Sequence, residues 1–408
     1  MEQKKINRNI IFSVVAVLLL VIVVAGATYA YFSATASTDV QTVTTGSLTM
    51  GFTNGDIVRA DGLAPIADSE IKTKAAELDF SVTNTGTEHM NLTISLTDIV
   101  IPDALKDVDF RWGLYNKDTG VGLSFGIFKD IGTATSMVIY RDTIIDAVLD
   151  ENEPDITNNY TLRVWIHDDG ALQNYMQGQT FSAKVTVDGE AVQYTDEDCF
   201  TFNNGTITEY DEATCGTDVV IPKTIDGITV TSIDDSAFVY TEDGIGITSI
   251  IIPNSVTNFS FQYTSCNSLT IPESVTTLKN IGEGSFENIY IPESVTSLDA
   301  LSTGYNPINS LILPGSLSNS GTHEPSGDVY TVILMDGITE IPEYAFGMFD
   351  FEEIEIPASV TTIESMAFAE NPNLTKIILR GKTSVPDTFD ENWNSTGEGN
   401  FYNVEFRP

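Results

Sequence analysis

The chain has 408 residues, of which 58 are acidic and 19 basic, giving a formal net charge of −39 at pH 7. A field of this sign repels the phosphates of nucleic acids and anionic lipid headgroups, so nucleic acid is excluded as a partner. Hydrophobic residues make up 42% of the chain, which allows two or three domains with full cores. The charge itself is best interpreted as a solvated acidic surface, and the sequence contains no Asp-x-Asp-x-Asp-Gly loop that would make calcium binding specific.

Residues 1–36 are predicted to be a targeting segment. Three basic residues within the first eight positions precede an unbroken apolar run over residues 10–25, and small residues follow. This order is typical of a secretory signal peptide, with cleavage after Ala30 or Ala36. Because the run is near the lower limit for crossing a bilayer, an uncleaved anchor is the alternative, in which the protein contacts the membrane only through residues 10–25.

Residues 37–190 are predicted to form an all-β domain. Apolar residues alternate with other residues over 78–82, 92–96, 162–166 and 181–187, which indicates strands with one buried face. No stretch has a strong helical period. A β-sandwich, jelly-roll-like in outline, is the simplest fold with these properties.

This half contains a series of short motifs: Ala-Thr-Tyr-Ala-Tyr-Phe-Ser-Ala at 27–34, Gly46-Ser47-Leu48, and the segments 78–86, 160–166 and 177–185. Their order resembles the TasA/camelysin family of secreted proteins of Gram-positive bacteria. The resemblance implies a secreted β-sandwich, in a family of which some members assemble into biofilm fibres. In that case the Thr- and Val-rich segment 37–50, once freed by cleavage, would add to the sheet of a neighbouring copy.

A short module over residues 191–216 joins the two halves of the chain. Its residues 199–207 are predicted to form a hairpin, and Cys199 and Cys215 lie 16 positions apart. In an exported protein these two cysteines are expected to form a disulfide. Cys266, the remaining cysteine, is expected to be a small buried side chain.

Residues 217–408 contain an internal repeat. Ile-Pro-x-Ser-Val-Thr occurs at 252–257, 271–276 and 291–296, with degenerate copies starting at Ile221, Leu313, Leu334, Ile356 and Leu379. The Pro positions are 222, 253, 272, 292, 314, 335, 357 and 380, so after the first gap they are 19 to 23 residues apart. This period indicates a solenoid, in which coils bury their apolar faces against neighbouring coils. Aliphatic residues one and three positions before each Pro position predict the inward side of a strand, and Ile-x-x-x-Ala-Phe elements fill the stack.

These repeats resemble the BspA-type leucine-rich repeats of bacterial surface proteins. The resemblance covers residues 217–408 and implies a β-solenoid used for binding. The coil that begins at Leu313 departs from the pattern, because it has no Ala-Phe element and leads into the polar stretch 322–328.

One face of the solenoid is a predicted ligand site. Residues between the inward aliphatics must point out of the same sheet, and they form a mainly apolar stripe: Ile251, Thr270, Tyr290, Ile312, Ile333, Glu355 and Ile378. Exposed contiguous apolar surface marks binding sites. The alternative is that β-branched residues simply favour sheet positions.

The sequence predicts no catalytic residues, no metal and no cofactor. The three histidines, His89, His167 and His323, fall in or beside expected loops, and a metal or triad site would require His89 and His167 to converge with carboxylates. There is no zinc-type cysteine spacing, nucleophile elbow or phosphate loop. We therefore predict an exported surface protein that binds a host or community protein or glycan through the stripe, without catalysis. A fibre-forming subunit that self-associates through the sandwich is the alternative function.

Overall fold

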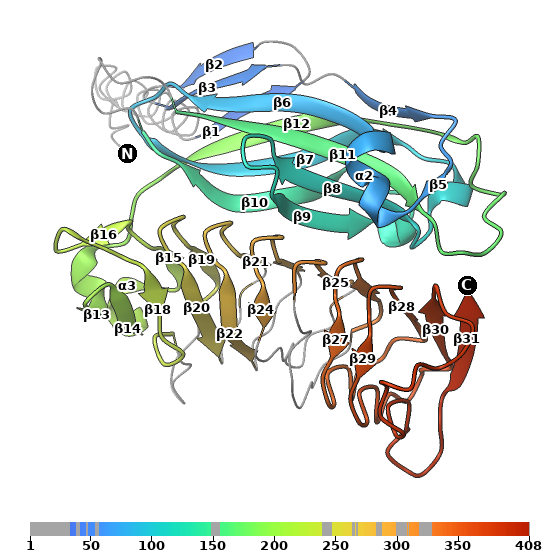
Figure 1. Ribbon diagram of the computed structural model, residues 1–408. Coiled ribbons are helices and arrows are strands. Elements are labelled where there is room, and N and C mark those ends of the chain that lie inside the picture. The colour runs from blue at the N-terminus through green and yellow to red at the C-terminus, as the bar shows by residue number, and fades with distance from the viewer. Residues whose placement is uncertain are drawn as a thin grey trace, which may run out of the picture.

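The structure, a computed structural model, describes residues 33–37, 41–45, 48–53, 57–147, 156–238, 247–262, 266, 268–282, 288–298, 308, 310–317 and 329–407. The basic and apolar parts of the predicted targeting segment lie outside these residues, as does His323. Within them, no helix is long and apolar enough to cross a bilayer. The chain forms two bodies, a β-sandwich that lies lengthwise along a β-solenoid (Figure 1).

The sandwich consists of two sheets. The first has the order β1 (Ser33–Ser37), β12 (Thr180–Val192), β7 (His89–Val100), β10 (Met137–Ile145), with β4 (Ile57–Asp61) also paired to β12. The second has the order β2 (Gln41–Thr45), β3 (Leu48–Thr53), β6 (Ala76–Asn84), β11 (Ile156–His167), β8 (Phe110–Asn116), β9 (Gly122–Ile127), with β5 (Pro65–Ile66) also paired to β11. Short helices follow or connect the strands: η1 (Asp68–Glu70), α2 (Ile71–Lys74), η2 (Asp103–Leu105) and η3 (Lys129–Ile131). The predicted β-sandwich is confirmed.

The alternating residues predicted to point inward form the core between these sheets. On β11, for example, Leu162, Val164 and Ile166 are fully buried. The opposite face of the same strand is also buried near its end, where Trp165 is only 1% exposed. A strand buried on both faces requires a second packing partner, and the solenoid provides it.

The segment predicted to be a free strand pairs within its own sandwich in this structure. β1 pairs antiparallel with β12, and β3 pairs antiparallel with β6. The described part of residues 37–50 therefore completes the edges of the chain's own sheets.

The solenoid has two rows of parallel strands. The row before each Pro position, which faces the sandwich, contains β15 (Asp218–Val220), β19 (Ser249–Ile251), β21 (Ser268–Thr270), β23 (Asn288–Tyr290), β25 (Leu311–Leu313), β26 (Val332–Leu334), β28 (Glu353–Ile356), β30 (Lys376–Arg380) and β31 (Asn403–Arg407). The second row contains β18 (Ser232–Ile233), β20 (Asn258–Gln262), β22 (Thr277–Gly282), β24 (Ser297–Leu298), β27 (Glu340–Ile341) and β29 (Thr362–Ile363). Equivalent residues of successive copies pair, as Leu269 does with Ile289, so each repeat is one coil.

The repeated Ser and Thr of the motif have a structural role. The hydroxyl of Ser274 donates to the carbonyl of Val256 at 2.6 Å, and that of Ser316 to the carbonyl of Val295 at 2.7 Å. Threonine hydroxyls bridge coils in the same way, as in Thr296 to the carbonyl of Thr276. Each of these hydroxyls satisfies a carbonyl of the preceding coil. At the same motif position, the buried hydroxyls of Ser255 and Ser294 have no hydrogen-bond partner within the described residues.

The predicted apolar stack is confirmed for the described coils. Residues three positions after each Pro position are fully buried: Val256, Val275, Val295, Leu317, Ile338 and Val360. Phenylalanines of the Ala-Phe elements stack between coils, and the rings of Phe346 and Phe368 have centroids 5.8 Å apart.

The Cys module is the first layer of the solenoid rather than a separate linker. Its hairpin, β13 (Phe200–Asn203) and β14 (Thr206–Tyr210), pairs with β18 and so heads the second row of strands. Around it lie η4 (Glu197–Cys199), α3 (Glu212–Cys215), β16 (Thr224–Ile225) and β17 (Ile228–Thr229). Phe200 and Ile207 belong to the solenoid core, and a disulfide joins Cys199 to Cys215. Cys266 is a free, buried thiol.

This disulfide should stabilise the first layer of the solenoid, residues 191–216, which we call the cap. Replacing both cysteines with serine (Cys199→Ser and Cys215→Ser) should lower the free energy of unfolding by about 3 kcal/mol, because the unfolded chain then regains the entropy of the closed loop. Urea unfolding of the two proteins would measure the difference. As a control, a reductant should destabilise the natural chain and leave the double variant unchanged. Equal sensitivity of both proteins to the reductant would contradict the prediction.

Candidate functional site

The predicted stripe lies on the face of the solenoid that the sandwich covers. Five of its seven residues are buried: Ile251 (6% exposed), Thr270 (4%), Tyr290 (9%), Ile333 (4%) and Ile378 (3%). Ile312 and Glu355 are partly exposed. The expectation that this stripe is an open apolar surface is therefore wrong. The sequence pattern correctly identified side chains that need a partner, but in this structure the partner is the chain's own sandwich.

Near the cap, the edge strand β10 supplies most of the cover. The rings of Tyr140 and Tyr290 meet edge to face with centroids 6.5 Å apart. The hydroxyl of Thr270 donates to the carbonyl of Arg141 at 2.8 Å, and that of Ser268 donates to Asp142 at 2.7 Å. β10 thus packs against the aromatic ring of one stripe residue, Tyr290, and accepts a hydrogen bond from another, Thr270.

In the middle of the solenoid, the glutamates of the Pro-Glu-Ser motif hold the sandwich. Glu273 accepts a hydrogen bond from the side chain of Asn116 at 2.8 Å, and Glu293 accepts one from the backbone N–H of Gly122 at 3.0 Å. Beyond them, Ile312 and Met335 pack in one apolar cluster with residues of the sandwich: Ile66, Ile71, Ala75, Tyr115, Phe125 and Trp165.

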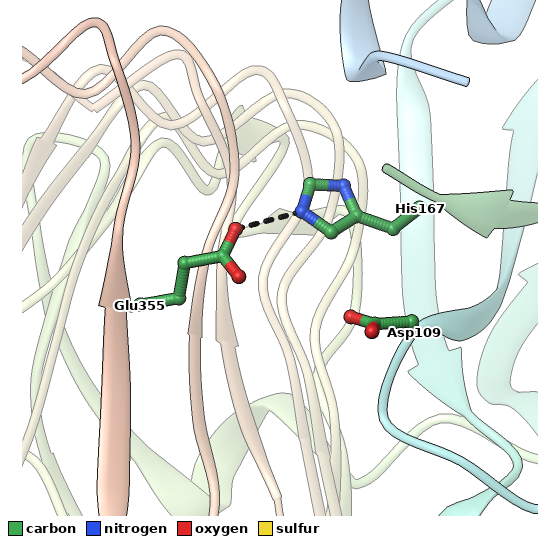
Figure 2. A group of neighbouring side chains, drawn as sticks. All are labelled: Asp109, His167 and Glu355. Carbon is green, nitrogen blue, oxygen red and sulfur yellow. Dashed lines mark hydrogen bonds and ion pairs between the residues drawn. The ribbon is translucent and has the colours of Figure 1, made fainter. Parts of the chain in front are cut away.

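At the C-terminal coils the interface becomes charged, and His167 at the end of β11 is its centre. Its Nδ1 lies 2.9 Å from a carboxylate oxygen of Asp68, and its Nε2 lies 2.8 Å from Oε1 of Glu355 on β28. Figure 2 shows the second contact, with Asp109 beside it on the sandwich side. His167 therefore joins the two bodies through its ring.

Two arginines complete this cluster. Nη1 of Arg380, on β30, lies 2.9 Å from Oε1 of Glu355 and 3.1 Å from Nε2 of His167. Arg111 lies 4.0 Å from Asp68 and 3.7 Å from Asp109. The amide of Gln173 donates to Asp109 at 2.8 Å and also to the carbonyl of His167. A chain with few cations thus concentrates several of them in one buried interface.

The arrangement changes the proton affinity of its members. Burial and the Arg111 guanidinium lower the pKa of His167, but the charge of Asp68 and the two hydrogen bonds of the ring outweigh them and raise it from 6.5 to about 8. Burial would raise the pKa of Asp68, yet His167 and Arg111 hold it well below its usual range. Burial would likewise raise the pKa of Glu355, but the hydrogen bond and charge of His167, with the charges of Arg111 and Arg380, lower it. Burial raises the pKa of Asp109 to about 6.

Asp109, His167 and Glu355 are also residues of the type that bind metal ions, with ligand atoms within 4.8 Å of one another. The sequence prediction required His89 and His167 to meet, whereas here His167 meets carboxylates of both bodies without His89. His89 lies apart, with Nδ1 3.3 Å from Asp146. An ion on Nε2 of His167 would have to displace Arg380, which already supplies a positive charge there. We therefore interpret the group as an ion-pair cluster.

A cleft of about 730 Å³ opens beside this cluster, between the sandwich and β26, β28 and β30. The sandwich contributes Asp107, Val108, Asp109, Arg111, Lys129, Asp169 and Tyr175. The solenoid contributes Tyr330, Thr331, Val332, Ile333, Leu334, Asp350, Glu352, Glu353, Glu355, Asn373, Ile378 and Arg407. The stripe residues Ile333, Glu355 and Ile378 thus line this cleft, while the other four lie outside it.

The cleft is acidic and has two accessible aromatic rings. Seven carboxylates and three cationic side chains line it. Tyr175 on the sandwich side is 52% exposed and Tyr330 on the solenoid side is 45% exposed. Sequence reasoning missed the cleft because its walls come from segments far apart in the chain. A partial signal was present, since Trp165 occupies an outward position of a predicted strand where solvated residues are expected.

Comparison with known families supports the solenoid. Residues 212–324 and 324–403 match the family described as BspA type leucine rich repeat region, in six copies. The C-terminal part of the chain is therefore a BspA-type leucine-rich-repeat solenoid. No curated protein and no solved structure matches the chain. The resemblance of the N-terminal half to the TasA/camelysin family stays a prediction.

The interface should couple the two bodies energetically. Ile312→Asp places a charge in the apolar cluster with Trp165, and should cost about 2–4 kcal/mol. In calorimetry, the sandwich and the solenoid of this variant should unfold in two separate transitions. The two bodies of the natural chain should unfold at closer temperatures, because the intact interface couples them. Ile228→Asp, at a residue that is 49% exposed, is the matched control and should change little. Identical thermograms for the two variants would argue against a cooperative interface.

The stability of the protein should depend on the charge of His167. Its pKa is raised on folding, so its contribution is fully present below pH 6.5 and is lost as the pH rises through about 8. The free energy of unfolding should fall by up to about 2 kcal/mol between pH 6 and pH 9. Urea unfolding at several pH values would measure this slope. His167→Gln should flatten the slope, and an unchanged slope in that variant would assign it to other groups.

Proposed function

We propose that the protein is an exported surface protein that binds a partner protein in the cleft between the sandwich and the C-terminal coils, without catalysis. The cleft carries this proposal, because both bodies contribute to its walls and three stripe residues line it. Proteins with BspA-type repeats are commonly secreted or displayed on bacterial surfaces, and leucine-rich repeats are protein-interaction scaffolds. Both properties support export and binding.

The chemistry of the cleft favours a basic segment of the partner. Within the described residues, no ion pair joins Asp107, Asp350 or Glu352 to a cationic side chain. Asp107 accepts from the hydroxyl of Tyr175, and Asp350 accepts from the amide of Asn373. Carboxylates held by neutral donors keep their full negative charge, which attracts lysine and arginine side chains.

The exposed tyrosines suit the same ligand. Cations bind over the faces of tyrosine rings, with arginine the more frequent partner. Tyr175 and Tyr330 belong to opposite walls of the cleft. An extended basic segment between them would place its aliphatic stems against Ile333 and Ile378. A glycan, the other partner predicted from the sequence, would use the tyrosines but gain little from so many carboxylates.

Catalysis has no support in the geometry of the cluster. Both ring nitrogens of His167 are occupied by Asp68 and by Glu355 or Arg380, and none of these partners is a hydroxyl or thiol nucleophile. Catalysis by a serine, threonine or cysteine nucleophile requires such a group beside the base. The leucine-rich-repeat fold is itself usually a non-catalytic scaffold.

The fibre-forming alternative rests on one observation besides the resemblance to the TasA/camelysin family. Among the described strands, β1 is an edge strand that pairs only with β12, through Ser33 to Ser37. An edge strand at the start of a folded domain can pair with another copy instead. Concentration-dependent polymers of the natural chain would favour this alternative over a binding protein.

Binding of an arginine-rich peptide tests the proposed site. The natural chain should bind it with an affinity that falls steeply with salt. The triple variant Asp107→Asn, Asp350→Asn, Glu352→Gln should bind at least about tenfold more weakly, because three attractive charges are removed. Isothermal titration calorimetry would measure both, with an acidic peptide and a neutral oligosaccharide as additional probes.

A second triple variant is the matched control. Asp387→Asn, Glu391→Gln and Glu398→Gln remove the same charge from exposed positions outside the cleft lining. It should bind nearly as well as the natural chain. If both triples weaken binding equally, the peptide responds only to net charge and the cleft is not the site. If only the oligosaccharide binds, the partner is a glycan.

A further inference from the structure

Nε2 of His167 has two neighbours that it cannot bond in the same protonation state. Glu355 Oε1, at 2.8 Å, is an acceptor and requires a hydrogen on Nε2. Arg380 Nη1, at 3.1 Å, is a donor and requires a lone pair on Nε2. Nδ1 faces the carboxylate of Asp68 at 2.9 Å and requires a hydrogen in both states. The surroundings therefore fix the Nδ1 proton and leave the Nε2 proton as the variable.

We propose that His167 is a proton switch between the two bodies, which bonds Glu355 when the ring is protonated and accepts from Arg380 when it is neutral. Asp68 holds the ring in place throughout. In the protonated state the sandwich is bonded to β28. In the neutral state the sandwich accepts a hydrogen bond from β30, and Glu355 keeps only its contact with Arg380.

Charged groups from every neighbouring element set this switch. Asp68 comes from η1, and Asp109 and Arg111 from the start of β8 and the turn before it. On the solenoid side lie Asp336 after β26, Glu355 on β28 and Arg380 on β30, with the backbone N–H of Asp336 3.4 Å from Asp68. Asp169, after β11, pairs with Arg407 of β31. Because these carboxylates outnumber the arginines, the cluster holds the proton of His167 to a higher pH than solvent would, in agreement with the pKa of about 8.

The switch would regulate the cleft, and this step rests on the proposed function. Glu355 and Asp109 line the cleft and lie beside the ring of His167. When the ring of His167 loses its Nε2 proton, one positive charge disappears next to the cleft lining. Glu355 then loses its hydrogen bond to the ring and keeps its contact with Arg380. A basic ligand should therefore bind more tightly at alkaline pH, by about three- to tenfold for one charge at this range.

The tautomer of neutral His167 tests the switch without any ligand. ¹⁵N NMR of the natural chain should show both ring nitrogens protonated at pH 6, and the Nδ1–H tautomer at pH 10. His89 has no such fixed tautomer, because its Nδ1 lies between a donor, the backbone N–H of Ala147 at 3.2 Å, and an acceptor, a carboxylate oxygen of Asp146 at 3.3 Å. Signals are assigned with His167→Gln and His89→Gln. An Nε2–H tautomer for neutral His167 would overturn the proposal, because Arg380 could not then donate to it.

The regulatory step is tested with an arginine-rich peptide, whose charge does not change with pH. Affinity should rise about three- to tenfold from pH 7 to pH 9 for the natural chain and His89→Gln, and less than twofold for His167→Gln. An equal rise in all three proteins would remove His167 from the regulation. If the peptide binds at neither pH while the tautomers are as expected, the proposed function fails and the switch stands as a property of the interface alone.

Discussion

The packing of the sandwich on the first row of solenoid strands, through β10 of its first sheet and β8, β9 and β11 of its second, is the contact on which the rest of the structure depends. The solenoid repeats place an outward aliphatic or aromatic residue on almost every coil, and water is a poor solvent for so long a stripe. Sheet-on-sheet packing covers it with Tyr140, Tyr115 and Trp165. The two halves of the chain differ in sequence pattern. The sandwich covers the outward stripe of the solenoid, and the solenoid covers the outward aromatic residues of the sandwich.

The interface changes in character along its length, and this gradient positions the site. It is aromatic and hydroxyl-bonded near the cap, glutamate-bonded in the middle, and ionic around His167. Ion pairs tolerate nearby water better than apolar contacts do, so the ionic end is where the two bodies can diverge into a cleft. The same acidic excess that would repel nucleic acid leaves carboxylates there that form no ion pair within the part of the chain that the structure describes.

Much of the fold could be predicted because its causes are local. The alternation around Leu162 and the spacing of the Pro positions follow from side-chain directions on a strand and from the stacking of identical coils. The disulfide between Cys199 and Cys215 required only short separation and an oxidising compartment. Burial of Val256 and its equivalents was likewise determined within one repeat.

The site could not be predicted in the same way, because it depends on how two bodies meet. Nothing near Glu355 in sequence indicates that its partner is His167, 188 positions earlier in the chain. The stripe illustrates the limit most clearly, since Ile251 and Tyr290 were correctly placed on the outward face but nothing in the repeats shows what covers that face. The outward Trp165 was the one local sign that the sandwich has a partner of its own.

The pairing of β1 gives the molecule a direction. Ser33 pairs with Glu190 at the end of β12, immediately before the chain enters the cap. His167 bonds residues of β28 and β30, and residues of the same strands line the cleft. These two strands lie at the opposite end of the solenoid from the cap (Figure 1). The start of β1 therefore lies at one pole of the molecule and the acidic cleft at the other. A molecule held by its leading segment would stand with the solenoid as a stalk and present the cleft at its tip, farthest from the surface that holds it.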